Sequence, residues 1–353
     1  MKLSTFLFAS IATPVLFAFA LPADTVSLQV KAGTTLNKSF ETTVEMTLDE
    51  MRMVMNGEEM DASMYGLEID MTNVSTLTFI DTYGRLENGR AASLVRTFDT
   101  LANNVETSQN NARTGPMDLS VSSASELEGV DVRFTWNAES GNYEAAFADE
   151  QSTEDVELLT ELNGDADLLG LLPEGDVAVD DTWKADTSVL IALMSPGGDV
   201  KLKPEEADDS APSDPTSELS FGDMLGDIDG EVTCTYLGIR EADGVNFAAI
   251  KFELDVTTSN DLTELIMDAG GNVEQDGVEI SFNSVDVEMS IEGEGTLLWD
   301  VRGGHFSSLE FSGDLEQIMD MSMALSTVQG EMDMDQAITM SGSLTLDFST
   351  TKE

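Results

Sequence analysis

The chain has 353 residues, of which 68 are Asp or Glu and only 16 are Lys or Arg, so its formal net charge is −52. A surface this acidic repels nucleic acid and anionic membranes, and the composition therefore predicts no nucleic-acid partner. Hydrophobic residues still make up 41% of the chain, which is typical of a folded protein and excludes an acidic disordered tail.

The N-terminus reads as a signal peptide over residues 1–23. Lys2 precedes an apolar stretch that ends at Ala18-Phe19-Ala20, and cleavage is expected after Ala20 or Ala23. The alternative is an uncleaved anchor, but a spanning helix needs about 20 consecutive apolar residues. We expect a secreted protein, periplasmic, at the cell surface or extracellular, with no transmembrane segment after signal removal.

Alternation of apolar and polar residues with period two dominates the mature chain and predicts antiparallel strands with one buried face. It is clearest at Val26 to Val30, Val44 to Leu48, Val130 to Trp136 and Ala248 to Val256. Turn sequences lie between such stretches, at Asn56-Gly57, Asn88-Gly89, Gly141-Asn142, Asp243-Gly244 and Asp276-Gly277.

Helical patterns are few. Ser152 can cap a helix that carries Val156, Leu158, Leu159 and Leu162 and ends at Asn163-Gly164. A short apolar piece follows from Leu168 to Leu172, and another candidate helix runs from Asp261 to Ala269.

These patterns predict a mainly β fold of two antiparallel β lobes, curved sheets or incomplete barrels, joined by short helices. The N-terminal lobe covers residues 24–150, the helical connector 151–176 and the C-terminal lobe 177–353. A flexible acidic insertion is expected over about 197–231, because residues 196–231 contain four of the eight prolines and are rich in acids.

The connector leads into Pro173-Glu174-Gly175-Asp176-Val177-Ala178-Val179-Asp180-Asp181-Thr182-Trp183. This stretch resembles the motif of an uncharacterised family of secreted bacterial proteins, in which a Val-x-Val strand and a Gly-Asp-x-Trp turn follow a proline. Asp180 stands where that family usually has Gly. The stretch from Gly295 to Phe311 resembles the closing hairpin of the family, and the family has no established activity to transfer.

Catalytic motifs are lacking, so the sequence predicts no catalytic residue. Cys234 and His305 are the sole cysteine and histidine, which supports neither a thiol–histidine pair nor a zinc site. No Gly-x-Ser-x-Gly motif occurs. A carboxylate pair for glycoside hydrolysis is neither supported nor excluded by so many acids.

Clustered oxygen ligands offer weak calcium sites at Asp165 and Asp167 and at Asp227, Asp229 and Glu231. Neither cluster fits the twelve-residue loop of a strong calcium motif. No other cofactor is expected.

Methionine is unusually frequent, with 19 in the chain and runs at every second position. The runs are Met51, Met53, Met55; Met319, Met321, Met323; and Met332, Met334. A row of thioethers on one side of a strand could bind Cu(I). Methionine side chains also fill a β core adaptably. The polar residues between the methionines favour this second interpretation, an ordinary half-buried strand. Met319, Met321 and Met323 are therefore the candidate ligand-binding residues.

Two functions of different kinds follow from the sequence. The first is a noncatalytic envelope or extracellular protein that binds an unknown apolar ligand or an envelope protein in the concavity of a sheet. The second is an acidic structural or cation-binding surface protein. A hydrolase is a third hypothesis that no motif supports.

Overall fold

The computed structural model describes residues 24–60, 66–111, 115–205, 225–268, 272–275, 278–327 and 330–352. The predicted signal peptide and the centre of the predicted insertion lie outside these residues. Strands hold 69% of the residues and helices 7%, which confirms the mainly β prediction.

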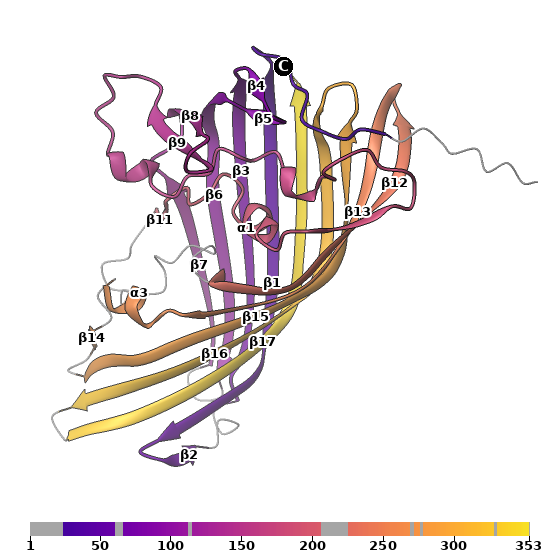
Figure 1. The fold of residues 1–353 in the computed structure, drawn as a ribbon. Coiled ribbons are helices and arrows are strands. Elements are labelled where there is room, and N and C mark those ends of the chain that lie inside the picture. The colour runs from indigo at the N-terminus through magenta and orange to yellow at the C-terminus, as the bar shows by residue number, and fades with distance from the viewer. Residues whose placement is uncertain are drawn as a thin grey trace, which may run out of the picture.

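Seventeen strands and a few short helices make up the described chain (Figure 1). The first nine strands are β1 (Thr35–Met55), β2 (Glu58–Met60), β3 (Glu68–Tyr83), β4 (Leu86–Glu87), β5 (Arg90–Ala91), β6 (Ser93–Asn111), β7 (Gly115–Ser125), β8 (Asp131–Asn137) and β9 (Asn142–Phe147). The short helices η2 (Val156–Leu159), η3 (Leu169–Leu171) and α1 (Val189–Met194) and the strands β10 (Thr182–Ala185) and β11 (Leu202–Pro204) follow. The rest are β12 (Asp227–Ala242), β13 (Val245–Asp261), α3 (Thr263–Asp268), β14 (Asn272–Gln275), β15 (Val278–Asp300), β16 (His305–Thr327) and β17 (Gly330–Lys352).

One large antiparallel sheet runs in the order β10-β12-β13-β15-β16-β17-β1-β3-β6-β7-β11. Each predicted lobe corresponds to a series of neighbouring strands, one from β1 to β7 and one from β12 to β17. The two-lobe arrangement is not confirmed, because β1 pairs with β17 along its length, from Leu36 opposite Lys352 to Met55 opposite Met334. Alternation marks the buried face of a strand but does not identify its neighbour, so it could not reveal this pairing.

The predicted tight turns are present where they are described. Asn56-Gly57, Asn88-Gly89 and Asp243-Gly244 each have positive φ at both residues, between 50° and 81°. Two-residue hairpin turns of this kind match the twist of the flanking strands, and Asn, Asp and Gly tolerate the left-handed backbone. Asp276-Gly277 lies outside the described residues.

The predicted helix after Ser152 is wrong. Only the single 3₁₀ turn η2 forms there, capped by Asp155, whose carboxylate accepts a hydrogen bond from the Glu157 amide. Glu161 then adopts a left-handed φ of 63°, so the chain leaves helical geometry before the expected end. The predicted helix near Asp261 is confirmed as α3.

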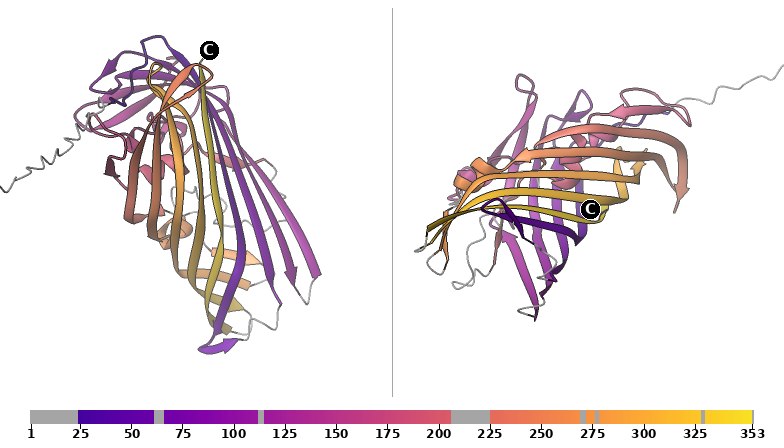
Figure 2. Two further views of the ribbon diagram at one scale, coloured as in Figure 1. Left: turned by 90° about the vertical axis from the view of Figure 1, so that its right-hand side faces the viewer. Right: turned by 90° about the horizontal axis from the view of Figure 1, so that it is seen from below.

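The sheet is strongly curved, and the connector with η2 and η3, together with the later helix α1, lies on its concave side (Figures 1 and 2). We call the end of the sheet near Lys352 proximal and the end near Met55 distal. Glycine allows a close approach at one bend, because a Cβ on Gly295 would lie 2.3 Å from Phe252 Cζ. Phe252 stacks on Phe311 with their ring centroids 5.8 Å apart.

The sheet divides into two arms at its distal end. β1 pairs with β3 only as far as Thr47 opposite Asp70. Beyond this point β1 stays with β17 and β2. We call the distal parts of β1, β15, β16 and β17 the methionine arm, and the distal parts of β3, β6 and β7 the polar arm. The two arms diverge when the molecule is seen from below (Figure 2, right).

Candidate functional site

A buried ionic cluster lies on the proximal concave face. Lys38 Nζ donates to Asp81 Oδ2 and Asp167 Oδ1, both at 2.9 Å. Arg96 makes a two-pronged pair with Asp81, from Nε to Oδ1 at 2.8 Å and from Nη2 to Oδ2 at 3.0 Å. The Tyr83 hydroxyl donates to Asp167 Oδ1 at 2.6 Å. Two cations thus face two carboxylates, and the cluster is balanced in charge.

The balance keeps these groups ionised. Burial alone would raise the pKa of Asp81, but Arg96 and Lys38 hold it at about 2. Burial would likewise lower the pKa of Lys38, yet Asp167 and Asp81 keep it raised. For Asp165, burial together with the neighbouring Asp167 outweighs the effect of Lys38 and Arg90 and raises its pKa to about 6.

The cluster ties the connector to the sheet. Arg96 Nη1 donates to the Asn163 carbonyl at 2.9 Å, and Lys38 Nζ donates to the Ala166 carbonyl at 3.3 Å. Asp167 contributes its carboxylate to Lys38 and Tyr83. The predicted calcium ligand Asp167 therefore serves an internal ion pair, and Asp165 accepts from the Asp167 amide at 3.0 Å.

Lys38, Asp81 and Arg96 are not among the site residues predicted from the sequence. The signal that could have identified them is a charged residue at a position where the alternation predicts a buried apolar residue. Lys38 lies between Leu36 and Phe40 on the inner face of β1, and Arg96 has the same place between Leu94 and Phe98 on β6.

Burial of the concave face falls from the proximal to the distal end. On β17, Leu344, Leu346 and Phe348 are buried, whereas Met334 and Met340 are half-buried. On β16, Met319 and Met321 are half-buried and pack against the core, and Met323 is buried.

The register brings three methionine runs onto this face. Met319 lies opposite Ile338, which lies opposite Met51, and Met323 lies opposite Met334, which lies opposite Met55. The predicted ligand-binding residues therefore share one surface, the inner face of the methionine arm, with the other two runs. Residues that lie directly opposite in an antiparallel pair point to the same side of the sheet.

The polar arm also presents apolar side chains on the concave side. Leu119 lies opposite Thr107, Thr107 opposite Met71, and Met71 opposite the buried Met46. Leu119 is 56% exposed, and Met117, two residues before it on the same face, is 58% exposed. Large apolar side chains as open as these mark an interaction surface when they adjoin other apolar residues.

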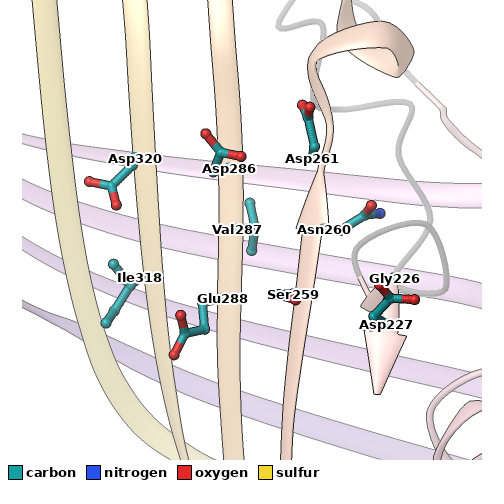
Figure 3. A pocket seen from close by; sticks show the side chains of 10 residues that line it. All are labelled: Gly226, Asp227, Ser259, Asn260, Asp261, Asp286, Val287, Glu288, Ile318 and Asp320. Carbon is teal, nitrogen blue, oxygen red and sulfur yellow. The ribbon is translucent and has the colours of Figure 1, made fainter. Parts of the chain in front are cut away.

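The convex face carries the acids. Glu231, Asp255, Glu292 and Asp314 lie directly opposite one another across β12, β13, β15 and β16. A second row of Asp261, Asp286 and Asp320 crosses β13, β15 and β16 (Figure 3). This row lines a hollow of about 490 Å³ that also includes Asp227.

The other predicted calcium ligands lie on this convex face. Asp227, Asp229 and Glu231 are exposed on β12, and Glu231 pairs with Lys184. Within the described parts of the chain, no group of three His, Cys, Asp or Glu side chains is arranged to hold a metal ion.

The single cysteine and histidine are both buried. Burial raises the pKa of the Cys234 thiol to about 12, which makes it a poor nucleophile. His305 Nδ1 lies 2.8 Å from the Phe306 carbonyl oxygen. Neither position offers the activated, accessible side chain that nucleophilic catalysis needs.

The Pro173–Trp183 motif forms a turn into the edge strand β10. Asp180 has a φ of 71°, a left-handed conformation that glycine adopts without strain. Trp183 lies opposite Cys234 on β12. Trp299 donates from its indole nitrogen to the Ser27 carbonyl at 3.2 Å, and its hairpin from β15 to β16 closes at Asp300 opposite His305.

Among the residues described, no helix is long and apolar enough to cross a membrane. In the comparisons with known proteins, no family model matches the chain and no curated protein matches it.

Proposed function

We propose that this is a secreted noncatalytic protein that binds an apolar ligand or the apolar segment of a partner on the inner face of the methionine arm. The half-burial of Met319, Met321 and Met340, beside fully buried core residues on the same strands, carries this proposal. Methionine suits such a surface because its unbranched side chain repacks around different shapes.

The structure supports the proposal in two further ways. The opposing polar arm carries the exposed Met117 and Leu119 on the same concave side, so a ligand between the arms would contact apolar groups from both. The connector and the ionic cluster fill the proximal part of the concavity, and α3 adjoins the distal part of β15. The distal faces of β16, β17 and β1 are then the place for a ligand.

Nile red, an uncharged dye that fluoresces in apolar surroundings, tests the proposal. Native protein should bind it saturably. Met321→Asp should weaken binding at least about tenfold, because a buried carboxylate without a partner is costly. Circular dichroism should show that the variant keeps its strands.

Ser312→Asp is the matched control. Ser312 is exposed on the convex side of the same strand, so the same added charge should change dye affinity by less than about twofold. The proposal fails if the native protein binds no dye, or if both variants bind it as the native protein does.

The acidic rows of the convex face favour a second function, a surface that attracts cations. Four acids in direct register would gather counterions without a defined coordination geometry. Equilibrium dialysis against calcium would test it, since specific binding predicts saturation at a fixed stoichiometry and a diffuse counterion layer predicts none.

A further inference from the structure

Acidic side chains lie almost entirely on the convex side of the distal sheet. The acids of β13, β15 and β16 point to the convex side, as the rows through Asp286 and Glu292 show. Among the described residues that face inward on the two arms, the only ionisable side chain is Glu58, at the outer tip of β2 opposite Met55. A molecule held between the arms would meet no cation to neutralise an anionic group.

Several described polar atoms on the concave face have no partner, among them Thr258 Oγ1, Thr350 Oγ1 and, nearest to where the arms diverge, Asn73 Oδ1. Asn73 Oδ1 is buried and accepts no hydrogen bond from any described residue. Asn73 lies between Val44 on β1 and Val105 on β6, close to where the arms diverge. A buried acceptor left unsatisfied costs free energy, which a ligand with a hydrogen-bond donor would recover.

We infer that the ligand is an uncharged amphiphile with an apolar chain and a hydroxyl or amide donor. The donor would reach Asn73 Oδ1 at the floor between the arms, and the chain would extend from there past Met71 toward Met340. This inference rests on the proposed function and adds the ligand class to it. Fatty-acid anions are disfavoured twice, by the overall charge of −52 and by the lack of an inward-facing cation.

Displacement of Nile red by amphiphiles that share one chain tests the head group. Dodecanol should displace the dye at concentrations at least about tenfold lower than dodecanoate or dodecyltrimethylammonium, each kept below its micelle concentration. Dodecyl methyl ether has no donor, and dodecanol should outcompete it about fivefold.

Asn73→Leu tests the acceptor. The variant should lose the preference for dodecanol over the ether, because it no longer has the acceptor that only the alcohol can use. Its melting temperature should stay equal or rise, since the unsatisfied acceptor is gone, whereas a purely structural asparagine would lower it. Asn104→Leu, on the convex face of β6, should leave the preference unchanged.

The outcomes separate the two proposals. If Nile red binds but dodecanoate or dodecyltrimethylammonium competes as well as dodecanol, or if Asn73→Leu keeps the alcohol preference, the ligand class is wrong and the binding function stands. If native protein binds no Nile red, both are wrong.

Discussion

Asp81 is the residue on which the buried ionic cluster depends most. Its two oxygens hold both Arg96 and Lys38, and all three side chains are fully buried. Taking such charges out of water costs several kcal/mol for each ion, and only the pairing and the additional hydrogen bonds offset that cost. The cluster therefore fixes the connector in one place more than it adds to the free energy of unfolding.

Replacing Asp81 should destabilise the protein strongly. Asp81→Asn keeps the shape but leaves Lys38 and Arg96 with Asp167 as their one carboxylate, and we expect the free energy of unfolding to fall by about 3–5 kcal/mol. Urea denaturation followed by circular dichroism measures it.

An exposed ion pair provides the control. Glu294→Gln removes the 2.7 Å pair with Lys251 on the convex face and should cost less than about 1 kcal/mol. Equal costs for the two variants would mean that the cluster is solvated in solution, against the burial described above.

The roles of the acidic residues near the ionic cluster could be predicted from the sequence only in part. Asp165 and Asp167 were recognised as clustered oxygen ligands, but their neighbours Lys38 and Tyr83 come from strands far away in the chain. Spacing along one segment cannot supply a partner from another strand, and for this reason a calcium site was predicted where an ion pair lies.

At the scale of elements, the glycines of the curved strands control how closely the sheet can pack. Gly295 lies opposite Phe252 on one side and Phe311 on the other; the Phe252 ring covers it and stacks on Phe311, whose ring lies over Gly293 and Gly313. A glycine without a side chain lets the sheet bend toward its concave side at this row.

Gly295→Ala should therefore destabilise the sheet by about 1–3 kcal/mol, because the new Cβ would displace the stacked rings. Gly175→Ala is the control, since a Cβ there would meet no atom within 4 Å. Thermal unfolding of the two variants compares them. A stable Gly295→Ala protein would show that the rings can move aside without loss.

Strands and hairpins were predictable because their signals are local. Alternation located the buried faces of β1, β8 and β13, and Asn-Gly or Asp-Gly located the turns. The absence of a regular helix after Ser152 could not be predicted, because the apolar residues there do have helical spacing. Tertiary contacts determine the structure of this segment. The Arg96 guanidinium donates hydrogen bonds to the carbonyls of Asn163 and Gly164, at the expected end of the helix.

For the molecule as a whole, the acids in register on the convex face oppose folding. Like charges directly opposite across strands are destabilising, and Asp286 has one on each side, Asp261 and Asp320. Salt reduces this repulsion, because the Debye length falls from about 10 Å at 0.1 M to about 3 Å at 1 M.

The melting temperature should accordingly rise between low and molar sodium chloride. Asp286→Asn should raise it at low salt and reduce its dependence on salt, with a gain of about 0.2–1 kcal/mol in the free energy of unfolding. Differential scanning calorimetry measures both effects. A melting temperature that does not change with salt, in both proteins, would show that the rows do not repel.

The pairing of β1 with β17 has a consequence for how the chain acquires its structure. The strands before the connector can pair with one another early, as can those after it. Among the described strands, the two groups join along the length of β1 and β17 and, over three residues, through β7 and β11. Contacts between residues so far apart in the sequence form slowly during folding. Until β17 pairs with it, β1 has a long unpaired edge that can associate with other molecules. A newly made chain would thus gain from a chaperone that shields β1 until its final residues arrive.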